Sequence, residues 1–163
     1  MIPAARVTQL VVVGVACAIA LPASAQLQRK ELSYAVAKTI AENALLDCHG
    51  RGYGVSVVVV DRGGNTVIAL RDDGASVHTM ENARRKAYTA MTFKMTTEEF
   101  VSEMARRSVR REQTTLPNVI AIGGGVPIRI EKDVIGGVGL SGSPGVDEGC
   151  VMAGMSKVTD QLK

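Results

Sequence analysis

Two histidines, His49 and His78, are the side chains of this chain best suited to bind a transition metal. His49 is expected at the end of a helix, where histidine commonly bonds terminal carbonyl groups or complements the helix dipole. His78 is expected near the start of another helix, on a polar face that it shares with Arg85. Their separation matches no established spacing of metal ligands, so each is either an iron ligand or an ordinary surface residue.

Basic side chains occur in two runs that could bind an acidic ligand. The first run is Arg84, Arg85 and Lys86, and the second lies within residues 106–111. Guanidinium and ammonium groups pair well with carboxylates. A solvated helix face explains the same runs, because Glu81 and other acids lie close by in the sequence.

Two glycine-rich segments could bring the backbone close to a ligand. The run Gly123, Gly124 and Gly125 forms either a tight turn or the backbone-lined floor of a small-molecule pocket, which Pro127 would border. Residues 137–142 spell G-x-G-x-x-G after an expected strand. Only one helix follows them, so no βαβ unit can form and a dinucleotide site is not expected.

No catalytic residue is predicted from the spacing of polar side chains. Asp61 and Asp72 flank an expected hairpin and could form an acid–base pair, but aspartate at a turn commonly caps its own loop. No Ser-His-Asp or Cys-His arrangement can be argued from the sequence. The pattern therefore favours binding over catalysis.

The N-terminus has the three parts of a secretory signal peptide, predicted at residues 1–25. Arg6 precedes an apolar run at 10–21, which is too short to span a bilayer, and Ala-Ser-Ala at 23–25 is a small-x-small cleavage signal. Cleavage would leave a periplasmic or secreted chain, 26–163, without a stable membrane anchor. A lipoprotein attached at Cys17 and an uncleaved anchor are the alternatives.

The composition of the remaining chain argues against a nucleic-acid or membrane-surface partner. Without Arg6, the 19 basic residues become 18 against 16 acidic residues, which is close to balance. Tryptophan is absent and aromatic residues make up 3% of the chain, so few platforms exist on which bases could stack. A small-molecule ligand is the expected partner.

The mature chain predicts one α/β domain of the α+β type, a single sheet flanked by helices. Apolar residues four apart indicate helices, and β-branched runs indicate strands. Helices are expected at 32–48 and 76–91, after a capping box formed by Thr96 and Glu99, and from Asp147 onward; strands are expected at 55–60, 66–71, 118–122, 126–130 and 134–140. Hairpins join most strands, so the five-stranded sheet should be largely antiparallel.

Cys48 and Cys150 remain after cleavage, an even number for an oxidising compartment. Both are expected on helices that flank the same sheet. They could form a disulfide at neighbouring helix ends, or remain two buried free thiols, since cysteine is among the most buried residue types. A bridge requires Cα atoms within about 7 Å of each other.

Six short segments, in this order, match one known family. They are VVDRGG at 59–64, RDDGA at 71–75, RKAYTA at 85–90, GGGVPI at 123–128, IGGVGLSG at 135–142 and DE at 147–148. With them the chain resembles the GlcG/HbpS family, also called the haem-degrading or DUF336 domain, and the C-terminal domain of PduO-type proteins. The segments cover essentially the whole mature chain.

The resemblance implies a profilin-like α/β/α sandwich, a homo-oligomer and, as in the secreted members, haem as the cofactor. Thr97 matches the threonine of a family segment implicated in haem contact, which makes it a third candidate iron ligand beside His49 and His78. Arg85 and Lys86 would then face the propionates. A helix face of small residues around Ala83 and Ala87 would let that helix lie close against the sheet or against a partner, and the second alternative also suggests assembly.

The leading hypothesis is therefore an exported binding protein for haem or a related tetrapyrrole. The alternative is a small-molecule enzyme or accessory protein of oxidative metabolism that uses the glycine-rich loops as its pocket. The third hypothesis is a scaffold protein whose role is assembly.

Overall fold

A computed structural model describes residues 29–163, and the predicted signal peptide lies outside them. The elements follow the order α1 (Tyr34–Gly50), β1 (Ser56–Asp61), β2 (Thr66–Arg71), α2 (Thr79–Phe93), α3 (Thr97–Ala105), η1 (Arg111–Thr115), β3 (Gly125–Ile130), β4 (Asp133–Ser141), α4 (Asp147–Ser156) and η2 (Thr159–Gln161). No helix among these residues is long and apolar enough to cross a membrane.

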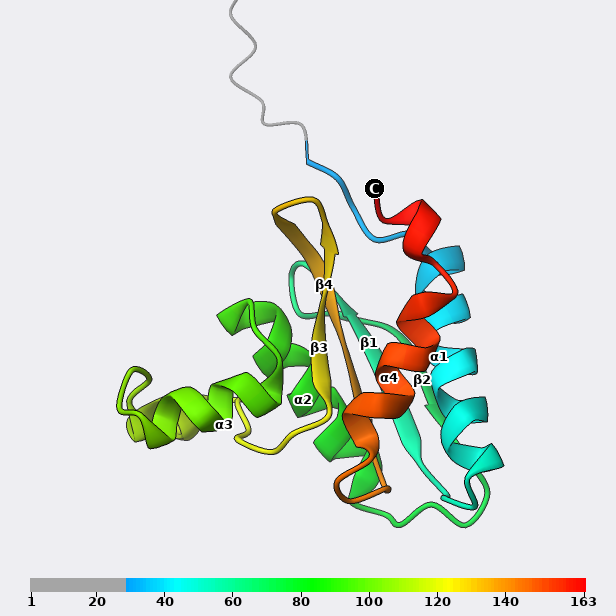
Figure 1. Ribbon diagram of the computed structural model, residues 1–163, viewed down its shortest axis with the longest axis horizontal. Helices are drawn as coiled ribbons and strands as arrows, with labels where there is room; N and C mark the ends of the chain where they lie inside the picture. The colour runs from blue at the N-terminus through cyan, green and yellow to red at the C-terminus, as the bar shows by residue number, and fades with distance from the viewer. Residues whose placement is uncertain (1–28) are drawn as a thin grey trace, which may run out of the picture.

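One antiparallel sheet with the strand order β2-β1-β4-β3 forms the middle layer (Figure 1). The expected mixed fold, a sheet flanked by helices, is confirmed. The predicted number of five strands is wrong, because the sheet has four strands and residues 118–122 form an irregular segment. The β1–β2 hairpin turns at Asp61, whose Oδ1 accepts hydrogen bonds from the backbone of Gly63 and Asn65.

The segment 118–122 satisfies its backbone through α2 instead of a neighbouring strand. The Ile120 N–H donates to the Thr89 hydroxyl at 2.9 Å, and the Val119 carbonyl accepts a hydrogen bond from Arg85 at 2.5 Å. Asn118 has φ 69°, outside the range of a strand. The apolar side chains at 119 and 120 are still buried, which explains why their pattern resembles that of a strand.

Helices α1 and α4 cover one face of the sheet (Figure 1). Large aliphatic side chains of all the central strands fill this layer, including Val57, Val138 and Leu140, which are fully buried. The two helices cross closely at Gly154, where a Cβ would lie 2.4 Å from the Ile40 carbonyl oxygen. Ser33 caps α1 by accepting a hydrogen bond from the Val36 N–H, as serine does at this position.

Helix α2 covers the opposite face through small residues. Cβ atoms at Gly137 and Gly139 would lie 2.3 and 2.1 Å from carbonyl oxygens of α2, so the helix rests directly on the strand backbone. The alanine face of α2, with Ala83 and Ala87 fully buried, is used for this contact. The small-residue face of α2 therefore packs on the sheet of the same chain and gives no support to assembly, which stays a prediction.

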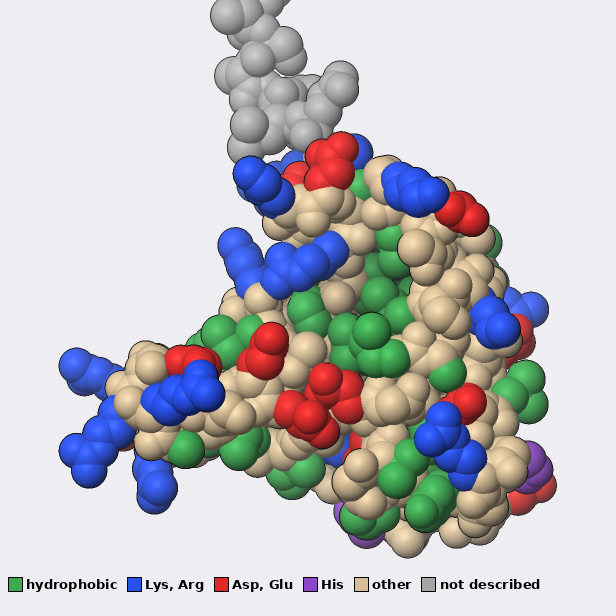
Figure 2. All heavy atoms as spheres, in the orientation of Figure 1, with side chains coloured by type: hydrophobic (Ala, Val, Ile, Leu, Met, Phe, Trp, Pro, Cys, Tyr) green, Lys and Arg blue, Asp and Glu red, His purple; other side chains and the backbone are tan. Residues whose placement is uncertain are grey.

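Helix α3 and η1 form an arm that extends sideways from the sheet (Figure 1). The predicted capping box is present, since Thr96 accepts from the Glu99 N–H and Glu99 accepts from the Thr96 N–H. Lys and Arg side chains gather at the outer end of the arm, and acidic side chains gather where it meets the body (Figure 2). Arg106 already pairs with Glu103, so part of the second basic run is a solvated helix face.

Candidate functional site

A cavity of about 710 Å³ lies between the N-terminal part of α2, the arm and the loop that follows β4. This volume is within the usual range for small-molecule sites. Its border is formed by Ser76, His78, Thr79, Asn82, Lys86, Glu98, Val101, Ser102, Ile122, Gly123, Ser141, Gly142, Pro144, Gly145 and Asp147. Four separate stretches of the chain, within 76–86, 98–102, 122–123 and 141–147, therefore build one concave site.

Helix α2 presents a polar stripe to this cavity. His78 stands immediately before the helix, and Asn82 and Lys86 follow at intervals of four residues, so all three lie on one side of it. His78 is exposed, Asn82 is half-buried and Lys86 is 1% exposed. The stripe thus runs from the solvent-accessible rim to the floor of the cavity.

A buried ion pair between Lys86 and Asp147 forms the floor. Lys86 Nζ lies 2.6 Å from Asp147 Oδ2 and 2.9 Å from the Leu140 carbonyl oxygen. Asp147 Oδ1 accepts hydrogen bonds from the backbone N–H and the hydroxyl of Ser143. Burying two charges is expensive, and hydrogen bonds to both oxygens of Asp147 offset that cost here.

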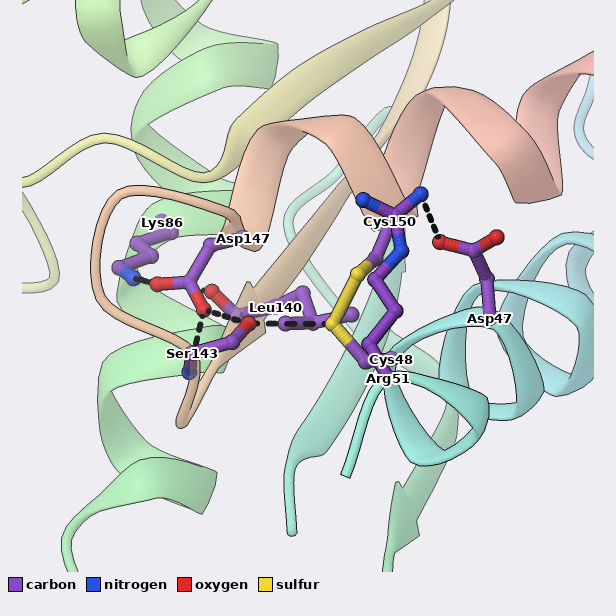
Figure 3. The surroundings of a disulfide bond; sticks show 8 residues. All are labelled: Asp47, Cys48, Arg51, Lys86, Leu140, Ser143, Asp147 and Cys150. Carbon is purple, nitrogen blue, oxygen red and sulfur yellow. Dashed lines mark hydrogen bonds and ion pairs between the residues drawn. A yellow bond between two sulfur atoms is a disulfide. The ribbon is translucent and has the colours of Figure 1, made fainter. Parts of the chain in front are cut away.

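The floor is connected to a disulfide in the opposite layer (Figure 3). Cys48 and Cys150 are bonded, with Cα atoms 5.5 Å apart, so the disulfide alternative of the sequence analysis is confirmed. The Ser143 hydroxyl lies 3.0 Å from Cys48 Sγ and also reaches Asp147. The 141–147 loop is therefore fixed between the disulfide on one side and Lys86 on the other.

Carboxylates gather where the arm meets the body, beside the mouth of the cavity. Glu98 borders the cavity, and its side chain covers Gly123, where a Cβ would lie 2.7 Å from Glu98 Cγ. Burial raises the pKa of the Glu148 carboxyl, and the nearby charges of Glu98 and Glu99 raise it further. The Thr96 hydroxyl opposes this shift.

His49 lies outside the cavity. Its Nδ1 is 2.7 Å from Asp72 Oδ2, and its side chain is 65% exposed. A carboxylate on Nδ1 leaves Nε2 free, which is the arrangement found around many metal-binding histidines. Of the two histidines, therefore, His78 borders the cavity and His49 is oriented toward solvent elsewhere.

The side chains of Thr97 and Arg85 form hydrogen bonds with the backbone of the same chain. Thr97 is fully buried, and its hydroxyl accepts a hydrogen bond from the Gly125 N–H at 2.8 Å. Arg85 is half-buried and holds the Val119 carbonyl. Neither borders the cavity, whereas Lys86, from the same basic run, does.

The glycine run contributes one residue to the wall of the cavity and two to the packing behind it. Gly123 borders the cavity, whereas a Cβ at Gly124 would lie 2.5 Å from Asp147 Cβ and 3.1 Å from Lys86 Nζ. Gly124 has φ 110°, where other residues are strained. Gly125 packs on α2, and Pro127 is buried in β3. The run thus allows the chain to close over the ion pair.

Sequence reasoning missed Asn82, Ser143 and Glu98 as site residues. It also treated Asp147 as a helix-opening acid, whereas this side chain pairs with Lys86. The spacing of His78, Asn82 and Lys86 was the available signal, because polar residues four apart on a helix share one side. The Asp147 pair had no such signal, since its partners are 61 residues apart.

No protein-built metal site is evident in residues 29–163. These residues contain no group of three or more His, Cys, Asp or Glu side chains that could hold an ion. Asp61 and Asp72 do not act as a pair: one caps the hairpin turn and the other binds His49. Hydrogen bonds from Asn65 and its neighbours outweigh the effect of burial and lower the pKa of Asp61.

Comparison with known families identifies the relatives of this arrangement. Residues 32–156 match the model of the family described as haem degrading protein HbpS-like. The chain belongs to the HbpS-like family. It is also 35% identical over 86 residues to an uncharacterized 15.0 kDa protein of the dhaT-dhaS intergenic region of Citrobacter freundii. That alignment covers 52% of this chain and 61% of the relative.

Solved structures of family members share the fold. A double mutant of HbpS from Streptomyces reticuli superposes with a TM-score of 0.78 at 30% identity, over 89% of this chain and 99% of HbpS. ORFY of Klebsiella pneumoniae, a DUF336 protein, gives 0.74 at 28% identity over 84% and 96%. A complex of PduOC with haem gives 0.72 at 25% identity over 80% and 96%. The suspected GlcG/HbpS resemblance is therefore confirmed.

Proposed function

We propose that this chain is an exported binding protein whose ligand is haem or a related tetrapyrrole, held in the 710 Å³ cavity beside α2. The observation that carries the proposal is that a member of the HbpS-like family has a cavity with an accessible histidine on its rim and a lysine on its floor. A relative of the same fold was solved as a haem complex, which supports this ligand class.

The residues around the cavity suit such a ligand. His78 would offer a ring nitrogen to the iron, and Val101 and Ile122 would contact the apolar macrocycle. Lys86 would face a propionate from the floor. When bound, haem would supply the redox and ligand-binding chemistry of its iron, while the protein determines orientation and polarity.

Export is part of the proposal. The sequence of residues 1–25 supports it, and so does the Cys48–Cys150 disulfide, because such bonds persist in oxidising compartments. N-terminal sequencing of the periplasmic fraction should give a chain that begins at Gln26. Recovery of the uncut chain in membranes, or a lipid on Cys17, would contradict it.

Homo-oligomerisation also remains a proposal, supported by the family resemblance. Light scattering at micromolar concentration should give a mass that is a multiple of the mature chain. A monomeric mass at that concentration would count against it.

A hemin titration tests the ligand directly. The exported wild-type protein should develop a saturable Soret band at about one haem per chain. His78→Ala should shift that band and weaken binding, whereas His49→Ala, a matched change of an exposed histidine outside the cavity, should leave both unchanged. No saturable band in the wild type would overturn the proposed function. An effect of His49→Ala alone would place the haem site at His49 and not in the cavity.

A further inference from the structure

Lys86 has one proton that the fold does not use. Its ammonium group carries three donors, and in residues 29–163 its hydrogen-bond acceptors are Asp147 Oδ2 and the Leu140 carbonyl oxygen. The side chain is 1% exposed and borders the cavity. A buried donor without an acceptor is costly, and a ligand oxygen in the cavity would supply the missing partner.

The negative partner of Lys86 is already hydrogen-bonded at both of its oxygens. Asp147 Oδ2 binds Lys86, and Oδ1 accepts two hydrogen bonds from Ser143. Asp147 therefore has little capacity to accept a hydrogen bond from a ligand. One N–H of Lys86 lacks an acceptor among residues 29–163, whereas three hydrogen bonds already occupy most of the acceptor capacity of Asp147. This difference favours a ligand group that accepts hydrogen bonds.

Two helix N-termini face the same cavity and add to this preference. Helix α2 begins beside His78 and α4 begins at Asp147, and neither has a side-chain hydrogen bond at its capping position. The N-terminal end of a helix carries about half a positive charge. The opposing charges are Glu81 in the first turn of α2, Asp147 and Glu148 in the first turn of α4, and Glu98 at the mouth. Glu81 and Glu98 are exposed to solvent and therefore screened, and Asp147 is neutralised by Lys86.

Apolar side chains complete the outer wall. Val101 and Ile122 border the cavity and are 38% and 46% exposed, so part of each side chain is open to a ligand. A ligand with an apolar body would cover both while its polar end reached Lys86.

We infer that this cavity is a binding site for organic carboxylates with an apolar body, with the carboxylate on Lys86 and the body against Val101 and Ile122. This inference rests on the same cavity as the proposed function and would place a haem propionate there, but it extends to carboxylates without any iron. Ligand selectivity would be determined by the charge of the ligand head group, which would bind to the buried ammonium group of Lys86.

The test is a titration of the ¹⁵N-labelled exported protein with benzoate and, separately, with benzamide, its neutral analogue. Benzoate should cause saturable amide shifts that include Gly123, Gly142 and Asn82, with at least tenfold tighter binding than benzamide. Equal binding of the two probes, or no saturable shift with benzoate, would overturn the inference.

A pair of variants identifies the determinant. Lys86→Met combined with Asp147→Asn removes both charges and keeps the acceptor for Ser143, and it should lose at least tenfold in benzoate affinity. Lys38→Met, an exposed lysine of α1 remote from the cavity, should bind benzoate like the wild type. Wild-type affinity in the folded double variant would overturn the role of Lys86; if that variant does not fold, the benzoate–benzamide comparison decides alone.

A parallel hemin titration separates the two proposals. Hemin binding without benzoate selectivity would contradict the carboxylate site and support the haem function. Benzoate selectivity without hemin binding would contradict haem as the ligand and support the carboxylate site.

Discussion

The two faces of the sheet are packed by different means. On the α1–α4 face, large aliphatic side chains and a disulfide fill the layer. On the α2 face, glycines of β4 and alanines of α2 bring backbones together, and the largest fully buried side chain is the charged Lys86. The first face holds the fold together, and the second leaves room for a cavity with a polar floor.

This difference shows where a small domain can accommodate a ligand. Large interdigitating side chains leave few voids, so a ligand site in the α1–α4 layer would reduce stability. On the α2 face, the arm and the 141–147 loop border a cavity beside the N-terminal part of α2. The Lys86–Asp147 pair closes its inner end.

The largest effect on stability is expected from Lys86→Met. This variant leaves Asp147 buried without its cation, which should reduce the free energy of unfolding by about 3–5 kcal/mol. Combined with Asp147→Asn, the same change should recover most of the loss. Denaturant unfolding measures both, and a loss below about 1 kcal/mol in the single variant would mean that the pair is not desolvated in solution.

Removing the disulfide tests the opposite face. Cys48→Ala with Cys150→Ala releases a link between residues 102 apart and should cost about 2–4 kcal/mol. Ser143 loses its sulfur neighbour as well, so a smaller effect on ligand affinity should accompany the loss. Thermal unfolding with and without reductant checks this result, and a variant as stable as the oxidised wild type would contradict it.

Two glycine substitutions test the backbone contact between α2 and β4. Gly139→Ala places a methyl group 2.1 Å from the Ala83 carbonyl oxygen and should cost about 1–3 kcal/mol. Gly149→Ala, in α4 with nothing within 4 Å, should instead stabilise by up to about 1 kcal/mol because alanine favours helix. Equal effects of both changes would show that α2 does not rest on β4.

Most of the secondary structure follows from local patterns. Period-four apolar stripes, β-branched runs and the Thr96–Glu99 capping box are encoded by residues close in sequence, and all but the run at 118–122 correspond to an observed element. The failure at 118–122 has a tertiary cause. Thr89 and Arg85 supply the backbone partners of this segment, and no local pattern reveals that a distant helix will do so.

The candidate site was less predictable than the fold for the same reason. His78, Lys86 and Gly123 were proposed and do border the cavity, because residue chemistry and family resemblance single them out. Ser143 and Asp147 act through partners distant in sequence, so only the folded chain brings them together. The site roles of all these residues remain predictions until ligand binding is measured.

The smallest expected effect concerns pH. The pKa of Glu148 is raised in the folded state, so its ionised form destabilises the fold at neutral pH. Its contribution is therefore most favourable below the ordinary glutamate pKa and is lost as the pH rises through the folded value. Glu148→Gln should stabilise the protein at pH 7.5 by less than about 1 kcal/mol and give no gain at pH 4. A gain at pH 4 alone would contradict this.

The proposed ligand site lies on the α2 face of the sheet. The most direct measurement is an amide-shift map of the ¹⁵N-labelled protein with gallium protoporphyrin IX, a diamagnetic analogue of haem. The shifts should be centred on residues 76–82, 122–124 and 141–147, and the amides around His49 should be unchanged. Shifts centred on His49 and the C-terminal end of α1 would contradict it.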